Sequence, residues 1–304
     1  MSNELSKPLD KRVGEPPPST WLSRALALPG ISKFTDADGV PIHYLEWGAA
    51  GVVPSLLFIP GYRAHARWWD CIAPLFAHRF HVVVMELSGM GGSGHRAAYS
   101  PECFVSDIAA VVKATRMQQP IGIGHSYGGA RLLRACSEFP RLFGRAIVVD
   151  SYMHFVEEGP LPEYPRIGSR RPYPDLAAAC VRFRLSPEQA FVDQALADYV
   201  ALGSLRETVG GWTWKFDSEL PGGGPTELNG ADVLAQVSVG VDYIYGEHSL
   251  VVNAARAQRI CAALPRARQP IEIPDAHHHV MFDQPVALIS VLQALLADHK
   301  QGFR

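Results

Sequence analysis

The sequence predicts an α/β protein in which a mostly parallel central sheet is flanked by helices. Short apolar runs alternate with longer stretches in which apolar residues recur every three to four positions. Nearly continuous apolar runs are typical of strands that are buried on both faces of a parallel sheet. At 304 residues, of which 47% are hydrophobic, the chain is long enough for one large core and an inserted subdomain.

The elements follow one another in a regular order. The predicted strands are, in chain order, 41–48, 55–61, 81–89, 120–126, 145–151, 241–247 and 269–275. The predicted helices are 103–117, 129–139, 252–264 and 285–299. Because strands and helices alternate, we expect helices to lie on both faces of the sheet.

One region breaks this alternation. Residues 151–240 are rich in proline, glycine and aromatic residues and contain no run typical of a buried strand. We expect them to form an inserted, mainly helical cap on a core domain made of residues 21–150 and 241–304. Residues 1–20 are polar and contain several prolines, which favours a flexible N-terminal arm.

Composition narrows the functional classes. The formal net charge of −2 offers no basic field for phosphates, so we expect no nucleic-acid partner. No signal segment and no apolar run long enough for a membrane span is found, and the five cysteines form no CxxC pair. We expect a cytoplasmic protein that acts on a small molecule without a cofactor. The arm or the cap could pair two copies as a homodimer.

The segment 120–139 carries the most specific motif. Gly124, Ser126 and Gly128 form G-x-S-x-G between an apolar strand and a helix. This context suits a nucleophilic serine held open at a sharp turn, where glycines let the strand and the helix pass closely. Ser126 is therefore the candidate nucleophile, and the start of the following helix favours an oxyanion beside it.

With this motif between a strand and a helix, the chain resembles the α/β-hydrolase superfamily, and the resemblance extends from residue 40 to residue 298. The superfamily usually has histidine-glycine after its third strand, and here Pro60 and Gly61 take those places. The resemblance implies an oxyanion hole at Gly61, in which the backbone N–H groups of Tyr62 and Tyr127 are the donors. Residues 85–94 resemble the glycine-rich loop after the family's fourth strand.

Three consecutive histidines follow the last predicted strand. In the family pattern the catalytic histidine lies five residues before an acid and seven before a proline, and Asp283 and Pro285 place it at His278. His277 and His279 are then neighbours with packing or polar roles. A metal site is the other interpretation, but consecutive loop residues lack the spacing of metal ligands, and we expect no metal.

The acidic partner of His278 is not where the family usually has it, because that place is Ser249. Glu247 is close in sequence but lies two residues too early. Asp150 ends the predicted strand next to the one that leads to Ser126. It therefore lies at the sheet edge where catalytic groups gather in α/β proteins. We therefore predict a triad of Ser126, His278 and Asp150, with Glu247 as the alternative acid.

Some branches of the superfamily keep the acid after strand six, among them certain haloalkane dehalogenases and the lactone hydrolases that open zearalenone. The sequence resembles that arrangement, and Ser126 excludes the carboxylate nucleophile of a dehalogenase. The resemblance implies a serine hydrolase that cleaves an ester or lactone. A cofactor-free, ring-cleaving dioxygenase that uses the dyad of His278 and Asp150, or a non-catalytic receptor, are the alternatives.

Aromatic residues near the oxyanion loop and in the cap suggest a bulky apolar or aromatic substrate, such as a macrolactone like zearalenone. The predicted pocket residues are Trp69, Tyr152, Trp212 and Trp214. The same side chains could equally be part of the core.

Overall fold

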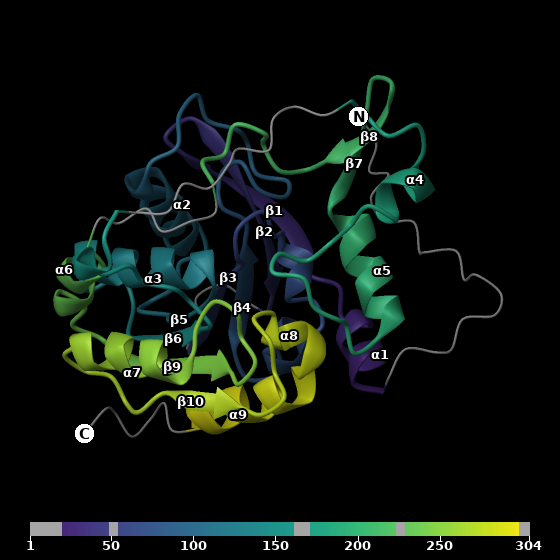
Figure 1. Cartoon of the computed structure of the whole chain (residues 1–304). Coiled ribbons are helices and arrows are strands. Elements are labelled where there is room, and N and C mark those ends of the chain that lie inside the picture. Colours follow the sequence, from purple (N-terminus) through teal and green to yellow (C-terminus); the bar gives the residue numbers. More distant parts are fainter. Residues whose placement is uncertain (1–19, 49–53, 161–170, 223–228, 298–304) are drawn as a thin grey trace.

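The structure, a computed structural model, describes residues 20–48, 54–160, 171–222 and 229–297 (Figure 1). An eight-stranded sheet lies at its centre, in the order β1-β2-β4-β3-β5-β6-β9-β10. The strands are β1 (Ile31–Ala37), β2 (Val40–Trp47), β3 (Ser55–Ile59), β4 (His81–Met85), β5 (Ile121–His125), β6 (Arg145–Val149), β9 (Gly240–Gly246) and β10 (Ile271–Ile273). In this described sheet β2 is antiparallel to both of its neighbours, β1 and β4, and all other neighbouring strands are parallel. The predicted α/β class with a mostly parallel sheet is confirmed.

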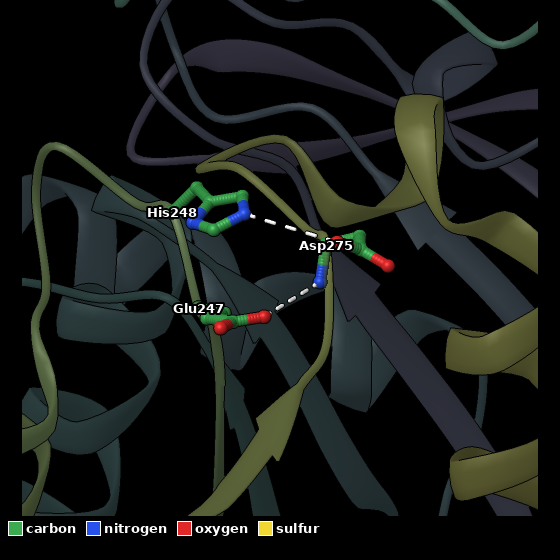
Figure 2. Close-up of side chains that lie close together, drawn as sticks. All are labelled: Glu247, His248 and Asp275. Atoms are coloured by element: carbon green, nitrogen blue, oxygen red, sulfur yellow. Dashed lines mark hydrogen bonds and ion pairs between the residues drawn. The ribbon is translucent and has the colours of Figure 1, made fainter.

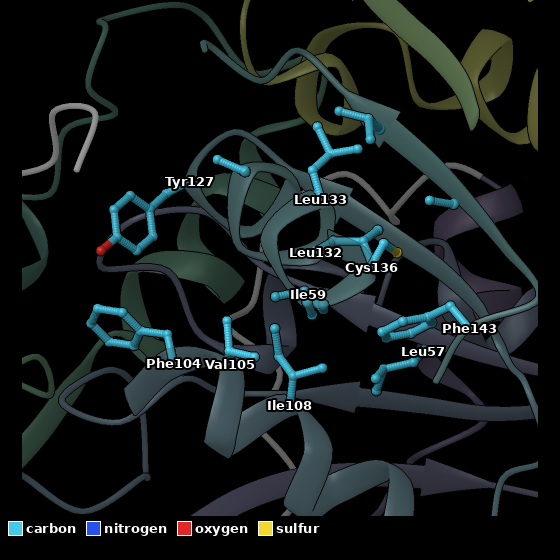
Figure 3. Close-up of a cluster of buried hydrophobic side chains, with 14 of the residues drawn as sticks. Leu57, Ile59, Phe104, Val105, Ile108, Tyr127, Leu132, Leu133, Cys136 and Phe143 are labelled. Carbon is cyan, nitrogen blue, oxygen red and sulfur yellow. The ribbon is translucent and has the colours of Figure 1, made fainter. Parts of the chain in front are cut away.

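Helices cover both faces of the sheet, because successive strand residues point to opposite sides. The helices of the core are α1 (Thr20–Leu26), α2 (Pro101–Ala114), α3 (Tyr127–Glu138), α7 (Ala254–Ala263), α8 (Val280–Asp283) and α9 (Pro285–Ala297). Leu57 and Ile59 of β3 pack with side chains from α2 and α3, a cluster drawn in Figure 3. Leu56 and Phe58 point the other way and pack with side chains from α1, α8 and α9. Both faces of β3 are therefore buried, as its apolar run predicts.

The first strand of the sheet, β1, is not among the strands predicted from the sequence. β1 has the sequence ISKFTDA, and most of its side chains are exposed. It lies at the sheet edge and pairs only with β2 within the described sheet. An edge strand of this kind has no continuous apolar run, so the pattern used for the buried strands does not detect it.

The described residues between β6 and β9 are those of the predicted cap. Its elements are α4 (Leu176–Cys180), α5 (Gln194–Gly203), β7 (Leu205–Thr208), β8 (Gly211–Trp214) and α6 (Gly230–Ala235). β7 and β8 form an antiparallel hairpin, which differs from the mainly helical cap predicted from the sequence. α6 packs against α3 and α7, so this last part of the predicted cap lies on the core.

Hydrogen bonds tie the cap to loops of the core. Nε2 of His65, in the loop after β3, lies 3.0 Å from the hydroxyl of Ser204, just after α5. The phenol of Tyr199 in α5 donates to Asp70 at 2.5 Å, and the N–H of Asp217 donates to the carbonyl of Gly89 at 2.8 Å. The cap is therefore held to the loops after β3 and β4.

The predicted N-terminal arm lies outside the described residues except for Thr20, at which α1 begins. Within the part of the chain that the structure describes, no helix is long and apolar enough to cross a membrane.

Candidate active site

Ser126 lies at a sharp turn between β5 and α3. Its backbone has φ 51° and ψ −123°, in the left-handed half of conformational space that non-glycine residues rarely occupy. The N–H of Ser126 donates to the carbonyl of Val149 at 2.9 Å, and the hydroxyl of Ser151 donates to the carbonyl of Ser126 at 2.7 Å. Hydrogen bonds from β6 and from the residues after it thus hold the turn on both sides.

The glycines of the motif have a steric reason. A Cβ atom added to Gly124 would lie 2.5 Å from the Cα atom of Gly129. One on Gly128 would lie 2.3 Å from the carbonyl oxygen of Pro60, and one on Gly129 would lie 1.9 Å from Oγ of Ser151. A Cβ atom does not come this close to an atom to which it is not bonded. β5, α3 and the loop after β3 therefore approach closely only because these residues are glycines.

His278 lies in the loop between β10 and α8, and its ring connects Ser126 to Asp150. Its Nε2 atom lies 2.9 Å from Oγ of Ser126, and its Nδ1 atom lies 2.7 Å from Oδ1 of Asp150. The side chain is almost completely buried. With the Nδ1–H group donating to the carboxylate, Nε2 is free to accept the hydroxyl proton of Ser126.

Asp150 follows directly after β6, and its side chain is fully buried. Its φ angle of 49° aims the carboxylate across the end of the sheet. Besides His278, the carboxylate accepts the N–H of Gly246 at 2.9 Å and the hydroxyl of Ser249 at 2.7 Å. A buried carboxylate needs such donors, since an unpaired buried charge is strongly unfavourable.

In the sequence, Ser249 occupies the place where the family usually has its catalytic acid. In the structure it supplies a donor to Asp150, and its Oγ atom also accepts the N–H groups of Val251 and Val252, each at 3.1 Å. The residue at the family's usual acid position therefore donates to the carboxylate of Asp150, which lies one strand over. No sequence pattern points to this role, because the contact joins two loops.

Glu247, the alternative acid, faces the surface. Figure 2 shows it with His248 and Asp275, all of them exposed. Its carboxylate accepts the N–H of Asp275 at 3.0 Å, and Nε2 of His248 lies 3.9 Å from the carboxylate of Asp275. The structure thus brings Asp150, and not Glu247, to His278.

The loop after β3 passes beside the turn that carries Ser126. A Cβ atom on Gly61 would lie 3.3 Å from Cβ of Ser126 and 3.0 Å from Nδ1 of His125. The rings of Tyr62 and Tyr127 pack with their centroids 5.6 Å apart. The phenol of Tyr62 donates to the carbonyl of Pro221 in the cap. Gly61 therefore lies beside Ser126, and the side chains of the two residues predicted to supply the oxyanion donors, Tyr62 and Tyr127, are in contact.

A buried glutamate holds this loop. Glu86, just after β4, accepts the N–H of Ala66 at 2.7 Å and that of Gly92 at 2.5 Å, and it lies 2.8 Å from Nδ1 of His43. Burial alone would raise the pKa of Glu86, but the hydrogen bond and charge of His43 lower it to about 2. Glu86 therefore stays ionised and ties the loops after β3 and β4 together.

The predicted pocket residues are scattered. Trp69 is a correction: it has no exposed surface and packs on Phe58 in the core, with ring centroids 5.0 Å apart. Trp212 and Trp214 lie in β8, and the ring of Trp214 is parallel to that of Phe216 in the cap. Tyr152 lines a separate open cleft of about 350 Å³, whose wall includes Ser249.

Two further histidines surround His278. The ring centroids of His125 and His279 lie 4.9 Å and 4.7 Å from that of His278. Burial lowers the pKa of His125 to about 3 and that of His279 well below its ordinary value, with the charge of His278 acting in the same direction. Both rings are therefore neutral near pH 7.

Comparison with known proteins agrees with this geometry. The model of the family described as "Alpha/beta hydrolase family" matches residues 56–291. The chain belongs to this alpha/beta hydrolase family. The prediction of the fold family is thereby confirmed, and the branch with its acid after strand six is not distinguished by this match.

Several relatives of this alpha/beta hydrolase are similar to parts of it. It is 29% identical to N-formylmaleamate deformylase of Pseudomonas putida over 116 residues, which are 38% of the chain and 42% of that protein. It is 22% identical to a serine hydrolase-like protein of Danio rerio over 272 residues, 82% of the chain and 83% of that protein. The match thus spans less than half of the deformylase.

Solved structures share the fold of this alpha/beta hydrolase. E-2-(acetamidomethylene)succinate hydrolase has a TM-score of 0.73 at 17% identity, covering 88% of this chain and 99% of that one. An esterase from Mycobacterium tuberculosis has a TM-score of 0.69 at 20% identity, covering 91% and 97%. At these identities the likeness shows the fold alone.

Proposed function

We propose that this alpha/beta hydrolase is a serine hydrolase that cleaves a carboxylic ester or lactone through an acyl-enzyme. The observation that carries the proposal is the unbroken chain of hydrogen bonds from Ser126 through His278 to Asp150, at 2.9 Å and 2.7 Å. The geometry supports general-base activation of a hydroxyl nucleophile.

In the first half of the reaction, His278 takes the proton of Ser126 as its oxygen attacks the carbonyl carbon. Asp150 stabilises the imidazolium that forms. The negative charge on the carbonyl oxygen is stabilised by the backbone N–H groups of Tyr62 and Tyr127, on the two segments that border Ser126. His278 then gives its proton to the leaving alcohol.

In the second half, His278 takes a proton from water as the water oxygen attacks the acyl carbon. The bond to Oγ of Ser126 breaks, the carboxylic acid leaves, and Ser126 regains its proton from His278. No step needs a cofactor.

The aromatic side chains of the cap support a bulky apolar or aromatic acyl group or a macrolactone such as zearalenone. Phe216 lies against the loop after β3. The guanidinium carbon of Arg63 in this loop is 4.8 Å from the ring centroid of Phe216 and 4.6 Å from that of Tyr62. Trp214 extends this aromatic surface away from the loop. A flat or cyclic apolar substrate would bury these rings.

A second candidate is the hydrolysis of a small amide that carries a carboxylate. Arg63 favours it, because the guanidinium follows directly after Tyr62 and would lie near a carboxylate on the substrate. The names of the deformylase and the succinate hydrolase describe such substrates for those proteins. Turnover of carboxylated amides but not of apolar esters, lost in Arg63→Ala, would favour this candidate.

The test is a panel of p-nitrophenyl esters, bulky lactones including zearalenone, and carboxylated amides, with wild type and Ser126→Ala compared. We expect Ser126→Ala to lose at least three orders of magnitude in kcat, because the acyl-enzyme cannot form. The Ser126→Ala protein should keep its thermal unfolding midpoint. Ring-cleaving oxygenase activity that survives in Ser126→Ala would instead assign the chemistry to the dyad, and saturable ligand binding without turnover would assign a receptor.

A further inference from the structure

A glutamine of the cap holds the loop that carries His278. The side chain of Gln189 makes three hydrogen bonds with His279. Its Oε1 atom accepts the backbone N–H of His279 at 2.7 Å and the ring Nδ1–H at 2.9 Å. Its Nε2 atom donates to the carbonyl oxygen of His279 at 3.2 Å. One side chain thus fixes both the backbone and the ring of the residue after the base.

The peptide group between His278 and His279 is held on both of its sides. Its N–H group donates to Gln189, as above, and its carbonyl oxygen, that of His278, accepts Nε2–H of His125 at 3.0 Å. His125 immediately precedes Ser126. The backbone of the base is therefore tied to the nucleophile's turn on one side and to the cap on the other.

The chain next to Gln189 strengthens this contact. The N–H of Val192 donates to the carbonyl of Phe282 at 2.8 Å, and the rings of Phe191 and Phe282 lie with centroids 4.7 Å apart. Phe282 belongs to α8, the short helix that begins directly after His279. Residues 189–192 thus form a clamp along residues 279–282, and Gln189 is the part of this clamp nearest to His278.

We propose that Gln189 is a positioning residue, which lets the seating of the cap set the place of the catalytic histidine over Ser126. The inference rests on the proposed role of His278 as the base. A base that must lie within hydrogen-bond distance of the serine loses rate steeply when it is displaced, since even 1 Å can cost about a hundredfold. If the cap moves away, His279 loses all three hydrogen bonds of Gln189 and the loop is released.

The first experiment measures the labelling rate of Ser126 by a fluorophosphonate probe, which needs no knowledge of the substrate. We expect Gln189→Ala to lower this rate about tenfold to a hundredfold, because His278 is no longer held for the proton transfer. With an ester that wild type hydrolyses, kcat should fall by a similar factor and KM should change little.

Gln194 provides the matched control. It is an exposed glutamine at the start of α5 in the same cap, and its Nε2 atom donates to Asp198 at 3.0 Å. Gln194→Ala removes a glutamine hydrogen bond from the cap without touching the loop of His278. It should be labelled at the wild-type rate.

A second variant separates positioning from general support of the fold. Gln189→Glu has the same shape, but it places a negative charge against the ring of His279 and removes the donor to its carbonyl. The titratable groups around that ring are His278 and His125, whose charges, together with burial, keep the pKa of His279 low. The new carboxylate should raise the pKa of His279. Its negative charge also favours the protonated form of the neighbouring base, His278, so the acid limb of the labelling rate should move upward by about one pH unit.

The titration is followed by NMR of the histidine side chains, with Gln194→Glu as the charge control. A raised pKa of His279 in Gln189→Glu alone, together with slow labelling of Gln189→Ala, supports the inference. Wild-type labelling of Gln189→Ala with an unmoved pH profile for Gln189→Glu would overturn it. If wild type is not labelled, the proposed function fails, whereas the NMR titration still shows whether the side chain at position 189 lies against the ring of His279 in solution.

Discussion

At the scale of single residues, Asp150 and Glu247 differ in what surrounds their carboxylates. Asp150 is fully buried and accepts hydrogen bonds from Gly246, Ser249 and His278. Glu247 is exposed and bonds to the backbone of Asp275. A carboxylate that stabilises an imidazolium is most effective where water is excluded, which favours Asp150.

We therefore expect Asp150→Asn to lower kcat by about three to four orders of magnitude, because the amide both removes the charge and disturbs the tautomer of His278. Glu247→Gln should stay within about twofold of wild type. The measurement is kcat/KM on whichever ester or lactone wild type cleaves fastest. Equal losses of activity in Asp150→Asn and Glu247→Gln would contradict the assignment of the triad's acid to Asp150 alone.

Ser249 offers a stricter form of the same test. Its Oγ atom already lies 2.7 Å from the carboxylate of Asp150, so an acid at 249 would lie close to the same ring nitrogen of His278. Ser249→Asp alone should lower activity, because the two neighbouring carboxylates repel each other. Combined with Asp150→Asn, it should recover at least about tenfold of the lost rate, and no recovery would restrict the acid's place to position 150.

At the scale of elements, β5, α3 and the loop after β3 depend on one another through their closest contacts. The Cβ atom of an alanine at Gly128 would lie 2.3 Å and 2.4 Å from the carbonyl oxygens of Pro60 and Ile59. Those carbonyls belong to backbone, which cannot rotate away as a side chain can. The helix that begins at the nucleophile thus fits against the oxyanion loop without spare room.

Gly128→Ala should therefore destabilise the protein by about 1–3 kcal/mol and slow fluorophosphonate labelling, since the overlap pushes the oxyanion loop away from Ser126. Urea unfolding and the labelling rate are the two measurements. Gly92→Ala is the control, because its Cβ atom would meet nothing closer than 3.4 Å. A Gly128→Ala protein as stable and as reactive as wild type would show that the loop is free to shift.

At the scale of the whole molecule, buried neutral histidines make stability depend on pH. Burial lowers the pKa of both His65 and His125 from 6.5 to about 3. Below pH 6.5 the unfolded chain binds protons that the folded protein does not, so each histidine costs about 1.4 kcal/mol per pH unit between pH 6.5 and 3. Asp70 acts in the opposite sense, because burial raises its pKa to about 6 and the folded state gains stability as pH falls from 6 to 3.8.

The two histidines together outweigh Asp70, so we expect the free energy of unfolding to fall as the pH is lowered from 7 to 5. Urea unfolding at half-unit steps measures the slope. His65→Gln, which can still donate to the carbonyl of Val200, should lose about one proton's share of that slope. A slope equal to that of wild type would mean that His65 does not stay neutral in the folded protein.

Over the whole molecule, the sequence could predict features that depend on neighbours along the chain. The buried strands follow from continuous apolar runs, and Ser126 follows from glycines spaced around a turn. β1 and the hairpin of β7 and β8 could not be predicted in this way, because most of their residues are exposed or half-buried and they carry no apolar run. Trp69 illustrates the opposite error, since its aromatic character fits a pocket and a core equally well.

The sequence by itself determined the fold class, the candidate nucleophile and the candidate base, because each is encoded in a short local pattern. The tertiary structure decided which acid meets His278, what Ser249 does, and that Gln189 reaches the histidine loop. Those contacts join residues 128, 99 and 90 positions apart, and hydrogen bonds of that kind depend on how loops meet at the sheet edge. Local pattern fixes the elements, and only their packing brings the side chains within hydrogen-bond distance.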